Sequence, residues 1–202
     1  MIKAIIFDMG GVIVDYKEEQ YYDYLSKKYN INRALIPKVF DPLIEEMECG
    51  KMKLSEMLQI VSKKLGITKE EIEWTSAFKR IGKRNEKMLK LLKILSKNYK
   101  VYLLSNISKS RYIEALKDFI NNETNLFDKR FASCYIGFRK PDKRIYRYVL
   151  KNINVKADEA VFIDDREENI KGAELVGING ILFTNYTTVV SSMKKLGIKC
   201  SK

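Results

Sequence analysis

The segment at residues 3–15, KAIIFDMGGVIVD, decides the fold. Residues 4–7 form a short apolar run with β-branched side chains, which is typical of a strand buried on both faces of a sheet. Asp8 ends this run, and open parallel α/β sheets bind their ligands at the carboxyl ends of their strands. Gly10 and Gly11 follow, and glycines allow a sharp turn and a close approach to the backbone. Asp8 is therefore either a functional carboxylate or an ordinary residue that caps the next turn.

The composition is that of an ordinary globular chain. Its 202 residues suggest one domain, or one domain with a large insertion, and 46% of them are hydrophobic and 32% charged. No apolar run approaches the roughly 18 residues that a membrane helix needs. The first apolar run is too short for a secretory signal, and Asp8 interrupts it. We therefore expect a cytoplasmic protein with no membrane partner.

The chain contains no histidine, which excludes Ser-His-Asp and Cys-His catalysis, histidine zinc sites and phosphohistidine chemistry. Its three cysteines, Cys49, Cys134 and Cys200, are far apart and form no CxxC motif, so we expect reduced thiols. Four residues separate Cys134 from Arg139, whereas the loop of cysteine phosphatases has five. The chemistry must therefore come from carboxylates, lysines, hydroxyl groups and a hard metal ion.

The formal net charge is +12. The lysines and arginines are scattered between apolar positions, with no long basic tract and no aromatic RNA-binding motif, so we expect no nucleic-acid partner. A positive field that attracts small phosphorylated metabolites explains the excess equally well.

Residues 16–84 show only helical periodicity, as at Met57, Leu58, Val61 and Leu65. Gly66 has the position of a helix C-cap, and residues 68–71 resemble a capping box. From residue 85 the pattern alternates. Strands are expected at 101–104, 131–135, 160–163 and 181–183, and helices at 88–95, 112–119, after Pro141, at 169–176 and at 187–196. This alternation predicts a parallel sheet covered on both faces, with a helical block inserted after its first strand.

Polar groups follow three of the expected strands, and a lysine lies in a loop between two of them. These groups are Asp8, Ser105 with Asn106, Asp164 with Asp165, and Lys140. Each has an ordinary explanation, such as a turn, a solvated loop or a helix N-cap. Parallel strands, however, bring their carboxyl ends to one edge. Together the groups indicate a phosphate site in which Asp8 is the nucleophile and Lys140 keeps it ionised and offsets negative charge.

The carboxylates at this edge also predict a metal site. Asp8, Asp164 and Asp165, with a backbone carbonyl, are the hard oxygen ligands that Mg²⁺ prefers. A bound cation would reduce the repulsion between an anionic carboxylate and an anionic phosphate.

The motifs FDMGGV, LLSN, RKPDKRIY and FIDDREENIKGA resemble the four motifs of the haloacid dehalogenase-like hydrolases. The resemblance covers nearly the whole chain and is strongest to small bacterial phosphatases of the α-D-glucose-1-phosphate phosphatase type. It implies a three-layer, Rossmann-like α/β core formed by residues 1–15 and 85–202, and a helical cap formed by residues 16–84. It also implies that Asp8 is phosphorylated and then hydrolysed.

The resemblance also implies roles for the remaining groups. Ser105 and Asn106 would bind phosphate, Lys140 would hold its charge, and Asp164 would hold Mg²⁺ with help from Asp165 and the Gly10 carbonyl. In the cap, the turn containing Glu48 and Gly50 either faces the site and selects substrate or is an ordinary helix-breaking turn. Trp74 is expected in the core of the cap.

Gly10 departs from the family pattern. Most phosphatases of the family have a second aspartate at this position, which protonates the leaving oxygen and later activates water. General acid catalysis contributes about 10²–10⁴-fold. Either activity is low, or another group substitutes, or the leaving group needs little help, as in sugar 1-phosphates. Asp15 is the nearest spare carboxylate in the sequence, and its ordinary role would be at the cap hinge.

The leading hypothesis is a Mg²⁺-dependent phosphatase that acts on small phosphorylated metabolites, with sugar phosphates preferred. One alternative is a catalytically weak relative that binds a phosphorylated ligand or a protein partner through its cap. The other is a haloacid dehalogenase, which needs no metal and therefore leaves Asp164 and Asp165 unexplained.

Overall fold

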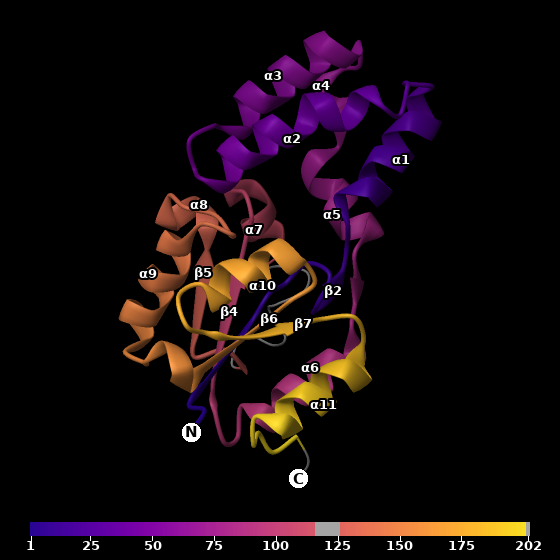
Figure 1. Cartoon of the computed structure of the whole chain (residues 1–202). Helices are drawn as coiled ribbons and strands as arrows, with labels where there is room; N and C mark the ends of the chain where they lie inside the picture. Colours follow the sequence, from indigo (N-terminus) through magenta and orange to yellow (C-terminus); the bar gives the residue numbers. More distant parts are fainter. Residues whose placement is uncertain (116–125, 201–202) are drawn as a thin grey trace.

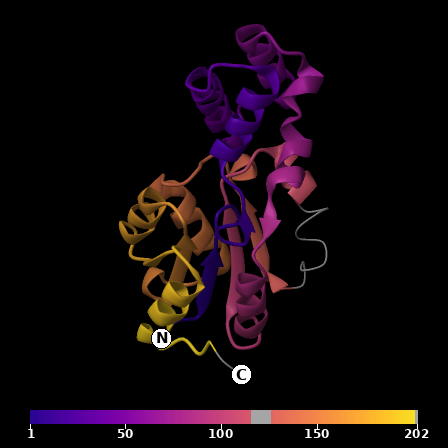
Figure 2. The same ribbon diagram turned by 90° about the vertical axis from the view of Figure 1, so that its right-hand side faces the viewer.

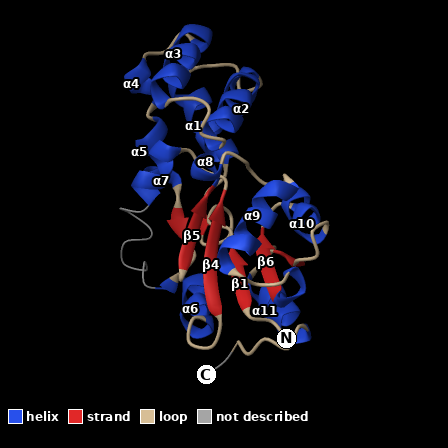
Figure 3. Cartoon of the chain, turned by 90° about the vertical axis from the view of Figure 1, so that its left-hand side faces the viewer, coloured by secondary structure: helices blue, strands red, loops and turns tan. Residues whose placement is uncertain are grey.

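The computed structural model describes residues 1–115 and 126–200, and its centre is a five-stranded parallel sheet (Figure 3). The sheet has the strand order β5-β4-β1-β6-β7. Its strands are β1 (Ala4–Phe7), β4 (Lys100–Ser105), β5 (Lys129–Ala132), β6 (Ala160–Asp164) and β7 (Asn179–Leu182). Helices follow the strands and cover both faces of the sheet, so the predicted three-layer α/β fold is confirmed (Figures 1 and 2).

Strand β1 is the central strand of the sheet and is buried throughout. Its residue Phe7 pairs with Leu103 of β4 on one side and with Ile163 of β6 on the other. Successive side chains of a strand point to opposite faces. Ile5 accordingly packs in one hydrophobic core and Ile6 in the other. This register brings the carboxyl ends of β1, β4 and β6 to the same edge.

Two pairs of helices cover the two faces of the sheet. The first core contains side chains of α6 (Glu86–Leu95) and α11 (Tyr186–Lys195), and the second those of α9 (Lys143–Ile153) and α10 (Glu167–Glu174). The shorter elements are α7 (Lys109–Ala115), α8 (Ser133–Ile136) and the 3₁₀ helix Ala157–Glu159. In the described part of the chain, no helix is long and apolar enough to cross a membrane.

A group of five helices lies beyond the carboxyl edge of the sheet (Figure 1). They are α1 (Glu18–Tyr29), α2 (Leu35–Glu48), α3 (Leu54–Leu65), α4 (Lys69–Ile72) and α5 (Trp74–Ile81), and we call them the cap. The chain enters and leaves the cap through β2 (Val14–Asp15) and β3 (Lys83–Arg84), which pair antiparallel. The helices fall within residues 16–84, and the domain boundaries proposed from the sequence stay a prediction.

Local signals in the cap and its aromatic core follow the expectations. Gly66 ends α3 with a φ of 69°, and the Thr68 side chain accepts a hydrogen bond from the Glu71 backbone at the start of α4. Trp74 is 3% exposed and stacks on Phe40 with a ring-centroid distance of 5.7 Å.

Two predicted strands are displaced. The strand expected at residues 181–183 is β7, which spans Asn179–Leu182. The strand expected at residues 131–135 is β5, which spans Lys129–Ala132, and the chain turns into α8 at Ser133. An apolar-run criterion misses the start of β5 because this edge strand begins with two charged residues. The helix expected at 112–119 is α7, which is described only as far as Ala115, and residues 116–119 lie outside the described residues.

Candidate active site

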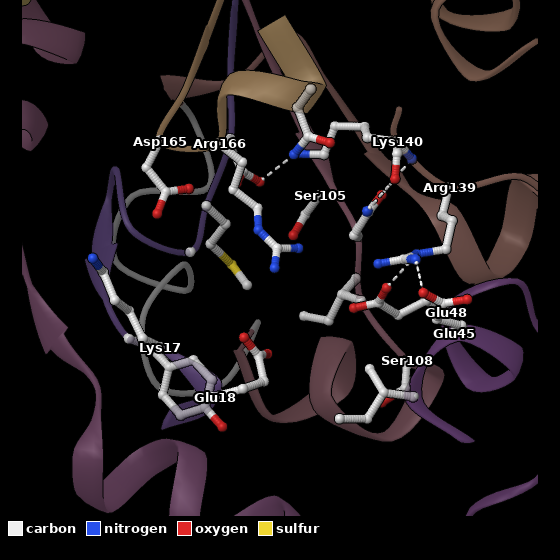
Figure 4. A pocket seen from close by; sticks show the side chains of 18 of the residues that line it. Lys17, Glu18, Glu45, Glu48, Ser105, Ser108, Arg139, Lys140, Asp165 and Arg166 are labelled. Carbon is white, nitrogen blue, oxygen red and sulfur yellow. Dashed lines mark hydrogen bonds and ion pairs between the residues drawn. The ribbon is translucent and has the colours of Figure 1, made fainter. Parts of the chain in front are cut away.

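The strand ends named by the sequence line one cleft between the sheet and the cap (Figure 4). Asp8 follows β1, Ser105 ends β4, and Asp165 follows β6. The cleft has a volume of about 920 Å³, and its cap side is formed by residues of α1, α2 and α5. The predicted convergence of polar groups at one edge is therefore present in the structure.

Lys140 is buried at this edge, with only 1% of its surface exposed. Its Nζ lies 2.8 Å from Asp8 Oδ1 and 2.6 Å from Asp164 Oδ2. It also donates a hydrogen bond to the Leu104 carbonyl over 3.2 Å. An ammonium group buried between two carboxylates holds both carboxylates in place, and they in turn restrict its own movement.

Burial and charge act in opposite directions on the ionisation of Asp8 and Lys140. Burial raises the pKa of Asp8 to about 8, although Lys140 opposes the shift. Burial acts to lower the pKa of Lys140, but Asp164 and Asp8 outweigh it and the pKa is raised. Lys140 acts on Asp8 in the direction expected from the sequence, since it lowers the pKa of that carboxyl, but burial has the larger effect. A second cation at the site would restore the balance.

Three carboxylates at this edge could hold such a cation. Oxygen atoms of Asp8, Asp164 and Asp165 all lie within 4.8 Å of one another. Burial, and after it the charge of Asp164, raises the pKa of Asp165. An all-oxygen set of mutually repelling carboxylates fits a hard divalent cation such as Mg²⁺. The Gly10 carbonyl stays a predicted further ligand.

Asn169 orients Asp164, and the sequence analysis missed this role. The Asn169 amide donates to Asp164 Oδ1 over 2.9 Å and to Oδ2 over 3.1 Å, and the Arg166 backbone donates to Oδ1 over 2.9 Å. The signal in the sequence was an asparagine in the first turn of the helix after a strand that ends in aspartate. Such a residue faces back toward the strand end.

The sequence analysis treated Gly10 and Gly11 alike, but their surroundings in the structure differ. Gly11 has a φ of 73°, and a Cβ atom there would lie 2.2 Å from Asp165 Oδ2. Gly10 is different, because a Cβ atom there would meet only the Tyr16 carbonyl, at 3.9 Å. Gly11 is therefore required by the turn and by Asp165, whereas position 10 has room for a side chain.

Ser105 and Asn106 both line the cleft, but their side chains differ in their contacts. Ser105 is 2% exposed and faces the cleft, as predicted for a phosphate ligand. The Asn106 amide instead donates to the Lys140 carbonyl over 2.9 Å and accepts from the Lys140 N–H over 2.8 Å. The Asn106 side chain thus holds the main chain of Lys140, and the phosphate contact expected of Asn106 stays a prediction.

The structure separates Glu48 from Gly50. Glu48 lines the cleft and accepts a hydrogen bond from Arg139 Nε over 2.8 Å, and Arg139 also pairs with Glu45 at 2.8 Å. Burial raises the pKa of Glu48 to about 7, although Arg139 opposes the shift. Gly50 does not line the cleft. A Cβ atom there would lie 2.3 Å from the Cys134 carbonyl, so Gly50 allows the cap to approach α8, and the predicted substrate contact is not supported.

Arg111 is a second arginine that links the cap to the α/β core, and the sequence analysis missed it as well. Arg111 in α7 is 5% exposed and stacks on Trp74 at 3.5 Å. It donates to the Tyr16 hydroxyl over 2.7 Å and lies 3.5 Å from Glu18 Oε1. No spacing rule marks an arginine in this position, because its partners are distant in the sequence.

The comparisons with known proteins agree with this geometry. The D-ribitol-5-phosphate phosphatase of Bacteroides thetaiotaomicron is 30% identical over 186 residues, which cover 87% of this chain and 89% of that protein. The sesquiterpene phosphatase astK of Aspergillus oryzae is 29% identical, with 96% of each chain covered. The chain spans only 34% of the length of the drimenol cyclase drtB of Aspergillus calidoustus, to which it is 30% identical.

A solved structure and a family model extend this similarity. The family enzyme bt-2542 of Bacteroides thetaiotaomicron, in complex with magnesium and inorganic phosphate, has a TM-score of 0.77 and 26% identity. The alignment covers 90% of this chain and 94% of that one. The family model described as haloacid dehalogenase-like hydrolase matches residues 2–177. The chain therefore belongs to the haloacid dehalogenase-like hydrolases.

Proposed function

We propose that this hydrolase is a Mg²⁺-dependent phosphatase of small phosphorylated metabolites, and that sugar or polyol phosphates are its preferred substrates. The observation that carries the proposal is the position of Lys140 between Asp8 and Asp164, within a set of three carboxylates. A nucleophile, a fixed cation and a hard-metal site are thereby combined at one end of a cleft.

In the proposed reaction, Asp8 attacks phosphorus and the bond to the leaving oxygen breaks. The resulting aspartyl phosphate is hydrolysed by water, which releases inorganic phosphate and regenerates Asp8. Lys140 stabilises negative charge on the transferred group, and Ser105 donates a hydrogen bond to a phosphoryl oxygen. Asp8, Asp164 and Asp165 would hold Mg²⁺, which supplies charge neutralisation when it is bound.

The lining of the cleft supports a hydroxylated substrate. Its walls carry the charged residues Lys17, Glu18, Glu19, Asp41, Glu45, Glu48, Arg111, Arg139 and Arg166. A sugar or polyol can donate to the carboxylates and accept from the guanidinium groups, whereas a terpene chain would remove them from water without replacing their hydrogen bonds. Of the two similar phosphatases, the one named for D-ribitol 5-phosphate therefore suggests the substrate class better than the one named for sesquiterpenes.

The test is hydrolysis of a panel of phosphate esters with and without Mg²⁺. The panel contains sugar 1-phosphates, polyol phosphates and a terpenyl phosphate, and the variants are Asp8→Asn and Asp15→Asn. Asp15 is the matched control, since it is exposed and follows the same turn. We expect Mg²⁺-dependent release of phosphate that Asp8→Asn abolishes and Asp15→Asn retains. Activity without metal, or activity that survives Asp8→Asn, would contradict the mechanism.

The same panel separates the two alternatives. Gly10 is the observation that favours a catalytically weak binding protein, since the family carboxylate is missing there, and this reading predicts no turnover of any ester. A 2-haloacid added to the panel tests the dehalogenase, which would release halide from it without Mg²⁺. The three cysteines are free thiols, which suits a reducing compartment, and we propose the cytoplasm as the location.

A further inference from the structure

We propose that Glu18, the first residue of α1, performs the proton transfers that a carboxylate at position 10 performs in most phosphatases of the family. This inference rests on the proposed phosphatase function. Gly10 has no side chain that could transfer a proton, and Glu18 of the cap would transfer it instead.

The backbone around position 10 provides the first argument. A Cβ atom built on Gly10 points toward the Tyr16 carbonyl, 3.9 Å away, with no closer neighbour. The chain continues from Tyr16 through Lys17 into α1, and Glu18 is the first residue of that helix. A side chain at position 10 would therefore point toward the segment that carries Glu18. The two positions can serve the same region of the cleft from opposite sides.

The placement of Glu18 in the cleft provides the second argument. Glu18 lines the cleft together with Asp8 and Ser105, and Figure 4 shows its carboxyl group pointing into the cleft below Arg166. Its side chain is 37% exposed, so it can exchange protons with water. Its contact with Arg111 is long, at 3.5 Å. Glu18 thus lines the same cleft as Asp8, and its contact with Arg111 is a long one.

Four other carboxylates of the cleft have shorter contacts than Glu18 has. Glu45 and Glu48 each lie 2.8 Å from Arg139, and Glu167 lies 2.8 Å from Lys171. Asp41 accepts a hydrogen bond from the Tyr22 hydroxyl. A proton-transfer group must break and remake its hydrogen bonds during each turnover, which favours the more weakly held Glu18.

Charged and titratable groups from several elements face Glu18. Arg111 approaches it from α7, and Arg166 approaches from the loop after β6. Glu48 of α2, Tyr22 of α1 and the preceding Tyr16 also interact with its charge. Glu18 therefore lies where groups of the core and of the cap meet.

Glu18 would transfer a proton in each of the two steps. When Asp8 attacks phosphorus, the bond from phosphorus to the leaving oxygen breaks, and the Glu18 carboxyl gives its proton to that oxygen. In the second step the Glu18 carboxylate takes a proton from water as the water oxygen bonds to phosphorus. The bond from phosphorus to Asp8 then breaks, and Glu18 is again protonated. Water is the only co-reactant.

The decisive experiment compares a polyol phosphate with 4-nitrophenyl phosphate, because the nitrophenolate leaving group needs little protonation. For Glu18→Gln we expect kcat on the polyol phosphate to fall about 10²–10³-fold, and kcat on the aryl ester to fall less than about tenfold. Asp23→Asn is the matched control, since Asp23 is an exposed carboxylate of the same helix and does not line the cleft. It should retain wild-type rates on both esters.

Gly10→Asp provides a rescue that does not depend on the stability of the Glu18 variant. A Cβ atom fits at position 10 without a close contact, so we expect Gly10→Asp to raise kcat of the Glu18→Gln variant on the polyol phosphate at least tenfold. An equal loss on both esters, or a Glu18→Gln enzyme as active as wild type, would overturn the role of Glu18. The proposed phosphatase function would still stand. A wild-type enzyme inactive on both esters would overturn the proposed function and this inference with it.

Discussion

The side-chain amide of Asn106 holds the main chain of Lys140 from both sides. It donates to the Lys140 carbonyl over 2.9 Å and accepts from the Lys140 N–H over 2.8 Å. The side chain of the same lysine reaches Asp8 at 2.8 Å. Asn106 is therefore a positioning residue that couples the end of β4 to the charge beside the nucleophile.

Asn106→Ala should lower kcat roughly 10–100-fold with little change in KM, because a displacement of about 1 Å at the reacting groups costs up to about 10² in rate. Steady-state kinetics on the best ester of the panel measures both constants. Asn152→Ala is the control, since Asn152 is an exposed asparagine of α9. A change confined to KM would indicate that Asn106 binds phosphate directly, as the sequence analysis predicted.

The two adjacent glycines should respond differently to alanine. Gly10→Ala should change the free energy of unfolding by no more than about 0.5 kcal/mol, because its Cβ atom has room. Gly11→Ala should destabilise by more than the 1–2 kcal/mol typical of a left-handed residue, because its Cβ atom also meets the Asp165 carboxylate. It should also reduce activity at least about tenfold.

Gly66→Ala isolates the backbone contribution in this comparison. Gly66 has a φ of 69° and nothing within 4 Å of its Cβ position. Denaturant unfolding of the three variants therefore separates the cost of a left-handed backbone from the cost of the close contact with Asp165. If Gly11→Ala and Gly66→Ala were equally stable and equally active, the close approach of Asp165 would have no consequence.

The sequence predicted the sheet and the residues at its edge because these depend on local patterns. A buried strand is a short apolar run, and a residue after it lies at the carboxyl edge whatever the rest of the chain does. Asp8, Ser105 and Asp164 were found in this way. Lys140 was found because it lies in a loop between two such strands.

The contacts between the cap and the sheet could not be predicted in the same way. Arg111 stacks on Trp74, and Arg139 bonds to Glu48, across long sequence separations that carry no periodic signal. The direction of the Asn106 amide depends on the path of the loop that contains Lys140. The room at Gly10 and the clash at Gly11 depend on backbone angles that two identical residues do not reveal.

Glu48 should make the stability of the protein depend on pH. Its pKa is about 7 in the folded protein against an ordinary value of 4.5, so the folded state binds more protons between these values. Its contribution to stability is fully present below about pH 4.5 and is lost as the pH rises to about 7. The loss is at most about 3 kcal/mol at 1.36 kcal/mol per pKa unit.

Glu48→Gln should remove this contribution, because glutamine does not titrate but still accepts a hydrogen bond from Arg139. The free energy of unfolding of wild type should therefore fall by roughly 1–3 kcal/mol more than that of the variant between pH 5 and pH 8. Urea unfolding at several pH values measures the difference. Glu45→Gln, which changes the other partner of Arg139, should keep the wild-type dependence, and parallel curves for wild type and Glu48→Gln would refute the assignment.

Mg²⁺ should stabilise the folded protein through the carboxylates of Asp8, Asp164 and Asp165. These groups repel one another within 4.8 Å, and a bound cation relieves the repulsion. At a concentration of about 100 times its Kd, a ligand adds about 2.7 kcal/mol of stability. For a chain of this size that is an increase in Tm of roughly 5–10 °C. Thermal melts with Mg²⁺, and then with excess chelator, should show the increase and its reversal. Asp165→Asn should lose most of it, whereas Asp158→Asn should keep it, because Asp158 is exposed and precedes the amino end of β6. An equal response of both variants would show that Mg²⁺ acts elsewhere on the protein.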